Sequence, residues 1–123
     1  MLKRKIYSCI SDYKNKNKTL LITGARQVGK SFIAREYGKN NFKQVVEINF
    51  LKDKNAVNAL QNIINSKDLM LKLSALVGKP FIKGDTLFIF DEVQEIPDLL
   101  THIKFLVEEG SYDYILTGSL LGV

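Results

Sequence analysis

The segment at residues 24–31, with the sequence GARQVGKS, constrains the fold of this chain more than any other stretch. It follows the apolar run TLLIT at residues 19–23. The segment fits the pattern G-x-x-x-x-G-K-[ST], in which a loop between a strand and a helix surrounds phosphate groups with its backbone N–H groups. The sequence therefore predicts a phosphate-binding loop, with a strand over residues 19–23 before it and a helix from Ser31 to about Lys39 after it.

The chemistry of phosphate binding explains the residue types in this loop. Gly24 and Gly29 lack a Cβ atom, so a phosphate can approach the backbone closely at both positions. Lys30 would place its charge on the β- and γ-phosphates, and Ser31 would bind Mg²⁺ at the N-terminus of a helix, whose dipole favours anions. The residues predicted to bind the nucleotide are Gly24, Ala25, Arg26, Gln27, Val28, Gly29, Lys30, Ser31 and Phe32.

The length and composition indicate one small globular domain. The chain has 123 residues, which is enough for a single core. We expect one domain over residues 1–123, with an amphipathic helix and a loop over residues 1–18. No apolar run approaches the roughly 18 residues of a membrane span, and the single Cys9 excludes an internal disulfide and suits a reducing compartment. These features predict a cytoplasmic protein with no membrane partner.

The net charge of +5 is unevenly distributed along the chain. Residues 1–43 contain eleven Lys or Arg residues and two acidic residues, whereas residues 44–123 contain seven Lys and eleven acidic residues. Basic charge around a phosphate loop fits an anion site, and the remainder could contact nucleic acid or another acidic partner. A basic nucleic-acid-binding protein is therefore an alternative function, although a solvated basic face explains the same charge.

Apolar periodicity predicts alternating strands and helices after the loop. Asn40 and Asn41 are expected to end the first helix. Further strands are predicted over Gln44–Phe50, Thr86–Phe90 and Tyr112–Leu116. Further helices are predicted from Asp53 to about Asn65, over Ser66–Val77, and from Asp98 to Gly110. This alternation predicts an α/β fold in which a parallel sheet lies between two layers of helices.

Polar residues follow three of the predicted strands, at the edge where parallel sheets bind their ligands. The phosphate loop follows the first strand, Asp91 and Glu92 follow the third, and Thr117 and Ser119 follow the fourth. Asp91 would hold Mg²⁺ through a water molecule. Glu92 would orient or deprotonate the water that attacks the phosphate. The three clusters together predict a Mg-nucleotide site.

These motifs resemble those of AAA-type P-loop ATPases. They are similar above all to the AAA domain of bacterial and archaeal ATPases that carry a C-terminal domain of unknown function. The resemblance rests on LITGARQVGKS at residues 21–31, LFIFDEVQ at 87–94 and ILTGS at 115–119. It implies a three-layer P-loop NTPase fold with the strand order 1-4-3-2. It also implies binding of ATP and Mg²⁺, and ATP hydrolysis in the motor or switch domain of a larger ATPase.

The resemblance further implies roles for particular residues. Glu92 would be the catalytic glutamate, with Lys30 assisting at the phosphates. Ser119, or less favourably Thr117, would be the polar sensor of the γ-phosphate or the attacking water. Asp91 and Ser31 would be the metal-binding residues. Arg26 and Gln94 are typical of this branch, but no role follows for either from the sequence.

Members of the family continue beyond this point into a final strand, a helical lid and an arginine finger. This chain ends at Val123, so we expect it to be truncated after the sensor motif. A homo-oligomer or a partner protein is expected to supply the finger, which can be worth ~10³–10⁵ in rate. A nucleotide-dependent switch or interaction module with negligible turnover is the other alternative function.

Overall fold

A computed structural model describes residues 20–23 and 28–118 of the chain. Four parallel strands form one sheet in the order β1-β4-β3-β2. The strands are β1 (Leu20–Thr23), β2 (Gln44–Asn49), β3 (Thr86–Asp91) and β4 (Asp113–Gly118). β4 therefore lies between β1 and β3, and β2 lies at one edge of the sheet. The predicted α/β fold with a parallel sheet is confirmed.

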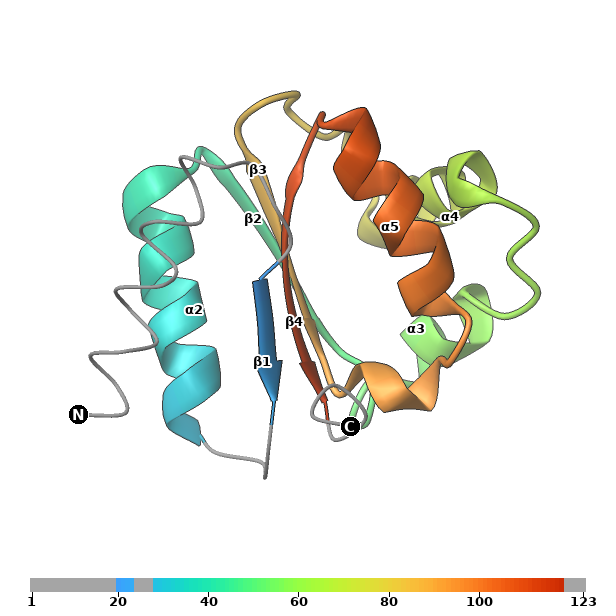
Figure 1. Ribbon diagram of the computed structural model, residues 1–123, viewed down its shortest axis with the longest axis horizontal. Helices are drawn as coiled ribbons and strands as arrows, with labels where there is room; N and C mark the ends of the chain where they lie inside the picture. Colours follow the sequence, from blue (N-terminus) through green and yellow to red (C-terminus); the bar gives the residue numbers. More distant parts are fainter. Residues whose placement is uncertain (1–19, 24–27, 119–123) are drawn as a thin grey trace.

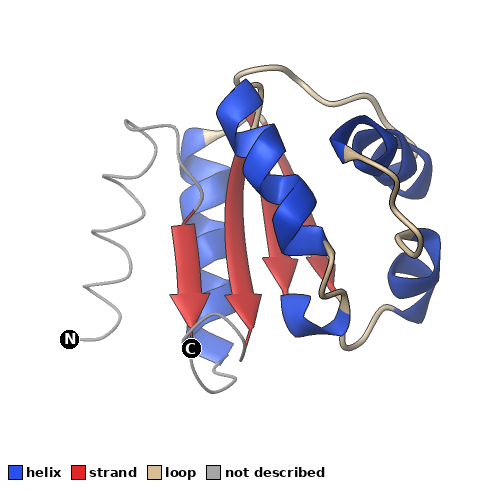
Figure 2. Ribbon diagram, turned by 45° about the vertical axis from the view of Figure 1, so that its right-hand side comes forward, coloured by secondary structure: helices blue, strands red, loops and turns tan. Residues whose placement is uncertain are grey.

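The described helices cover both faces of the sheet. They are α2 (Val28–Asn41), α3 (Lys54–Ala59), α4 (Ser66–Val77), the 3₁₀ turn η1 (Val93–Glu95) and α5 (Leu99–Glu109). Figure 1 shows α2 on one face and α3, α4 and α5 on the other, and Figure 2 shows the strands running in one direction between them. Within residues 20–23 and 28–118, no helix is long and apolar enough to span a membrane.

The larger core lies between the sheet and helices α3, α4 and α5. Its centre is aromatic: Phe88 of β3 stacks on Tyr114 of β4 with ring centroids 5.4 Å apart, and Phe81 meets Phe88 edge-on at 4.8 Å. All six residues of β3 are buried. A strand that is covered on both faces needs apolar side chains throughout, which explains the continuous apolar run at this position.

The smaller described core lies between α2 and the other face of the sheet. Gly38 allows this helix to pack closely, since a Cβ atom there would lie 2.8 Å from Cγ2 of Val45. Buried members of this core are Ala34, Tyr37, Phe42, Leu87, Ile89 and Ile115. The first turn of α2 contains the end of the predicted phosphate-loop motif.

The helix predicted from Asp53 to about Asn65 was wrong in its length. Asp53 caps α3 as expected, but the helix ends at Ala59. Asn62 then adopts a left-handed conformation (φ 57°), which breaks a helix. Asn65 caps the following helix instead, since its side chain accepts a hydrogen bond from the N–H of Asp68. Apolar periodicity continued through this segment, but the local polar side chains favour a turn.

Several other boundaries also differ from the prediction. Helix α2 begins at Val28, three residues before the predicted Ser31. Helix α2 continues through Asn41, because the Asn41 side-chain amide donates to the carbonyl of Tyr37 at 2.8 Å and prolongs the last turn. Strand β4 continues to Gly118 because its end pairs with β1, where Gly118 lies opposite Thr23. The helix and loop predicted over residues 1–18 lie outside the described residues.

Candidate functional site

The strand ends meet at one edge of the sheet. The register places Asn49 of β2 opposite Asp91 of β3, and Thr23 of β1 opposite Gly118 of β4. Helix α2 begins at the same edge (Figure 1). Its first turn contains Gly29, Lys30 and Ser31, whereas residues 24–27 lie outside the described residues. The fold therefore brings the end of the phosphate-loop motif and the acidic pair to one edge.

Asp91 and Glu92 are almost completely buried at this edge. Their exposed fractions are 3% and 9%. The hydroxyl of Thr117 lies between them: it donates to Oδ1 of Asp91 at 3.0 Å and accepts from the backbone N–H of Glu92 at 3.1 Å. A buried carboxylate needs such donors because desolvation without them is costly. Thr117 thus links the end of β4 to both acidic residues.

The backbone of Glu92 has an unusual conformation. Its dihedral angles are φ 61° and ψ 49°, in the left-handed region that non-glycine residues rarely adopt. Such a conformation costs about 1–3 kcal/mol and is most often found where function requires it. The chain turns here from β3 into η1. Within η1, the side-chain amide of Gln94 donates to Oε1 of Glu92 at 2.9 Å.

A second set of contacts orders the chain on the β2 side of the acidic pair. The N–H of Phe50 donates to the carbonyl of Asp91 at 2.9 Å. Arg35 of α2 forms a two-pronged ion pair with Glu47 of β2, at 2.8 and 3.0 Å. Glu47 raises the pKa of Arg35 by hydrogen bonding and by charge attraction, and Asp91 contributes a smaller attraction. The ion pair with Glu47 thus holds the Arg35 guanidinium against β2.

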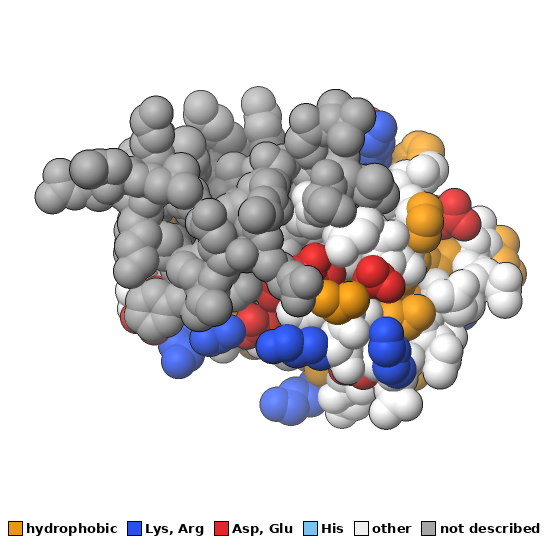
Figure 3. Space-filling view, turned by 90° about the horizontal axis from the view of Figure 1, so that it is seen from below, with side chains coloured by type: hydrophobic (Ala, Val, Ile, Leu, Met, Phe, Trp, Pro, Cys, Tyr) orange, Lys and Arg blue, Asp and Glu red, His pale blue; other side chains and the backbone are white. Residues whose placement is uncertain are grey.

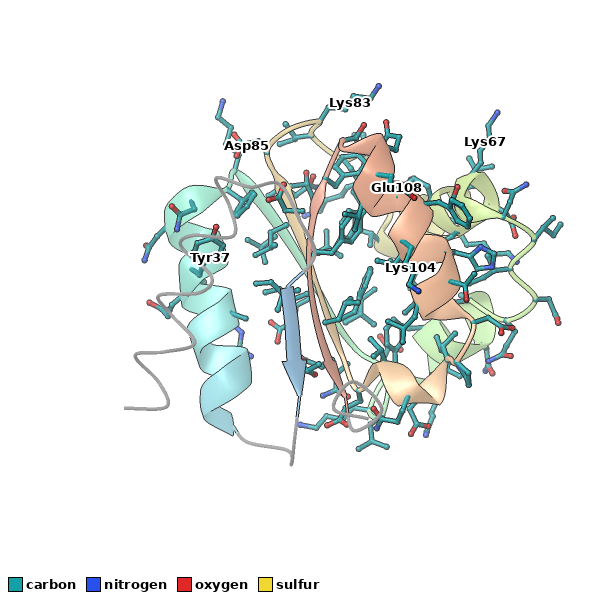
Figure 4. All side chains as sticks on the ribbon, viewed as in Figure 1. Tyr37, Lys67, Lys83, Asp85, Lys104 and Glu108 are labelled. Carbon is teal, nitrogen blue, oxygen red and sulfur yellow. The ribbon has the colours of Figure 1, made fainter. Side chains whose placement is uncertain are left out.

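Figure 3 views the molecule from the edge where the strands end. Acidic side chains are visible on this face, and several Lys or Arg side chains lie along one side of it. By contrast, Lys83 and Asp85, in the turn before β3, lie at the opposite end of the molecule (Figure 4). The strand-end face therefore carries both acidic and basic side chains.

The donor chemistry at this edge fits magnesium. Mg²⁺ keeps several waters and is usually bound through one or two carboxylates together with substrate phosphates. Asp91 supplies one buried carboxylate, and the Thr117 hydroxyl fixes its orientation. Among the described residues, no three His, Cys, Asp or Glu side chains lie together in a way that could hold a metal ion.

The sequence missed the connections that hold the acidic pair. The sequence indicates Thr117 only as a less favoured sensor, whereas in the structure it contacts both Asp91 and Glu92. No role for Gln94 follows from the sequence, whereas in the structure its side-chain amide donates to the Glu92 carboxylate. The signal that could have indicated Thr117 is a hydroxyl at the end of a buried strand, next to the strand that carries the acids. Ser119, the favoured sensor, lies outside the described residues.

Comparison with known proteins agrees with the geometry. No curated protein sequence matches the chain at a significant level. A protein-family model described as an AAA domain matches residues 16–123. This match covers most of the chain, including the phosphate-loop motif, the acidic pair and the end of β4. The chain therefore belongs to the AAA domain family, as expected for an AAA-type P-loop ATPase domain.

Proposed function

We propose that this chain binds Mg-ATP at the carboxyl edge of its sheet and hydrolyses it, as the motor or switch domain of a larger AAA-type ATPase. Membership of the AAA family supports a nucleotide-binding function of the ATPase type. The observation that carries the proposal is the buried pair Asp91–Glu92, joined by Thr117 at the edge where α2 begins. Carboxylates at this position suit metal binding and water activation.

The proposed binding residues are those of the loop and the first turn of α2. The backbone from Gly24 to Phe32 would surround the phosphates, and Lys30 would contact the β- and γ-phosphates. Ser31 and Asp91 would hold Mg²⁺, which when bound neutralises negative charge on the phosphates. The N-terminus of an α-helix favours an anion, because its first backbone N–H groups have no partner within the helix.

Glu92 is the proposed general base. Its carboxylate would accept a proton from the attacking water, while the backbone bond to Thr117 and the side-chain bond to Gln94 hold it in place. Ser119 is proposed to contact the γ-phosphate or that water. A homo-oligomer or a partner protein is proposed to supply the arginine finger.

ATP binding tests the first half of the proposal. Titration of the purified chain with a fluorescent ATP analogue, with and without Mg²⁺, should give saturable binding that Lys30→Ala weakens strongly. Lys39→Ala is the matched control because Lys39 is exposed in the last turn of the same helix. Equal affinities for the wild type and Lys30→Ala would contradict the proposed role of the loop.

Phosphate release tests the second half. Glu92→Gln should keep ATP affinity and lose turnover, whereas Glu95→Gln, which removes a charge from η1, should keep both. Normal hydrolysis by Glu92→Gln would refute the assigned base.

Binding without turnover in the wild type would favour the nucleotide-dependent switch. Binding of DNA that persists without nucleotide and weakens steeply with salt would favour the nucleic-acid-binding alternative.

A further inference from the structure

Gln94 is the residue whose contacts go furthest beyond the roles assigned above. We propose that Gln94 is a positioning residue that holds the Glu92 carboxylate against the end of β4. This inference rests on the proposed function, in which Glu92 is the general base. It adds a residue for which the sequence gave no role, and it links two parts of the site that are more than twenty residues apart in the chain.

The first observation is the hydrogen bond between the two side chains. The Gln94 amide donates to Oε1 of Glu92 at 2.9 Å, which is a normal distance for a strong contact. A bond to an ionised acceptor is stronger than one between neutral groups. Because Glu92 also has a fixed left-handed backbone, this bond restricts the remaining freedom of its side chain.

The second observation is the fit between Gln94 and Gly118. A Cβ atom on residue 118 would lie 2.6 Å from Oε1 of Gln94, 3.1 Å from Cγ2 of Val93 and 3.2 Å from the Val93 nitrogen. The carboxamide oxygen of Gln94 therefore faces the backbone of Gly118, while its nitrogen faces Glu92. The amide spans the gap between the acidic residue and the end of β4, and glycine at position 118 leaves space for it.

The third observation is that β4 also contacts the acidic pair directly, through the residue before Gly118. Thr117, the residue before Gly118, accepts from the N–H of Glu92 and donates to Asp91. Consecutive residues of β4 thus position the backbone of Glu92 through Thr117 and its carboxylate through Gln94 and Gly118. A general base held in this way needs little rearrangement at the moment of proton transfer.

Steady-state hydrolysis tests the consequence for turnover. Gln94→Met has a side chain of similar length without the amide donor, so it separates the hydrogen bond from packing. We expect kcat to fall about 10-fold to 100-fold, because a misplacement of about 1 Å can cost on the order of 10² in rate. The affinity for ATP should stay unchanged. A Gln94→Met variant with wild-type kcat would overturn the inference and leave a packing role.

A double-mutant cycle tests the contact with Gly118. Gly118→Ala should lower kcat in the wild-type background, because the added methyl group displaces the Gln94 amide. In the Gln94→Ala background the same substitution should have a much smaller effect, because the displaced group is absent. Equal effects in both backgrounds would assign the effect to Val93 or to the backbone of Gly118 (φ 158°) and overturn the inference.

Amide NMR of the nucleotide-free chain separates this inference from the proposed function. The side-chain amide signals of Gln94, identified by their loss in Gln94→Met, should shift in both Glu92→Ala and Gly118→Ala. The signals of Gln61, whose amide donates to the carbonyl of Val57 on the exposed surface, are the control and should not shift. Unchanged Gln94 signals overturn the inference even if ATP is hydrolysed. Shifted signals in a chain without ATPase activity support the contact and refute the proposed function alone.

Discussion

The two ends of β3 both carry buried polar groups, but they differ in charge and in backbone conformation. At the amino end, the fully buried Thr86 hydroxyl lies 2.8 Å from Oε1 of Gln44 and accepts from the N–H of Ile82 at 2.9 Å. At the carboxyl end, Asp91 and Glu92 are buried carboxylates. Neutral groups that satisfy one another stabilise a fold, whereas buried charge is costly.

The left-handed residues at the two ends show the same contrast. Gly84 precedes β3 with φ 78°, and Glu92 follows it with φ 61°. Glycine adopts such angles without steric cost, and glutamate does not. The amino end therefore has the residue that local stability favours. The carboxyl end has a residue that local stability disfavours, which is expected where a side chain is needed for function.

The largest expected effect comes from Glu92→Gly, which makes the carboxyl end resemble the amino end. Removal of the proposed general base should reduce turnover by about 10²–10⁴-fold. Relief of the left-handed strain should offset the lost side-chain contacts, so the free energy of unfolding should stay within about 1 kcal/mol of the wild type or exceed it. Phosphate release and urea denaturation measure the two quantities.

Two outcomes would contradict the proposed difference between the two ends of β3. A fall of more than about 2 kcal/mol in the free energy of unfolding of Glu92→Gly would show that Glu92 mainly stabilises the fold. Unchanged turnover would show that it is not the base. Glu92→Gln is the matched variant, because it keeps the left-handed strain and removes only the charge.

Replacement of threonine by valine, made separately at each end of β3, should give the next largest effect. Thr86→Val removes a fully buried hydroxyl and should lower the free energy of unfolding by about 1–2 kcal/mol without changing ATP affinity or turnover. Thr117→Val removes the donor to Asp91 and the acceptor for the Glu92 N–H. It should lower kcat about tenfold or more, as misplaced catalytic groups do. If Thr86→Val lost turnover and Thr117→Val did not, the amino end of β3 would be the functional end and the carboxyl end the structural one.

Gly84→Ala should have a smaller effect, confined to stability. A Cβ atom at this position would have no neighbour within 4 Å, so the only cost is the left-handed backbone. We expect a loss of about 1–2 kcal/mol in the free energy of unfolding, measured by urea denaturation. Gly78→Ala is a matched control, since Gly78 has φ 77° and equally open surroundings. A much larger loss at Gly84 than at Gly78 would indicate that the turn before β3 has a further role.

The sequence predicted the features that depend on local pattern. A continuous apolar run indicated β3, because a strand that is buried on both faces must be apolar throughout. Asp91 and Glu92 were placed at the carboxyl edge from their position directly after such a run. The end of α3 was mispredicted because a left-handed Asn62 interrupts a pattern whose apolar spacing is helical on both sides.

The connections within the site depend on non-local structure, which a single sequence does not show. Thr117 contacts Asp91 only because β4 pairs with β3 in one particular register. Gln94 reaches Glu92 only because the backbone turns through a left-handed residue into η1. A shift of one residue in the β3–β4 register would move Thr117 to the other face of the sheet. Residue types therefore identified the acids, and the fold identified their partners.

The smallest expected effect comes from an exposed polar cluster away from both ends of β3. Asp68 of α4 accepts from the N–H of Ile64 at 3.0 Å and pairs with Lys72 at 3.1 Å. The pKa of Asp68 is lowered from its ordinary value of 3.8, first by the Ile64 bond and then by Lys72. A lowered pKa in the folded state gives stability that is present above pH 3.8 and is lost as the pH falls below it.

Asp68→Asn should therefore show a slightly smaller loss of stability on acidification than the wild type, measured by urea denaturation across the acid range. Lys72→Met should keep most of the dependence, because the Ile64 bond is the larger cause. Identical pH dependence in the wild type and Asp68→Asn would show that this exposed cluster adds nothing to stability, in contrast to the buried hydroxyl of Thr86.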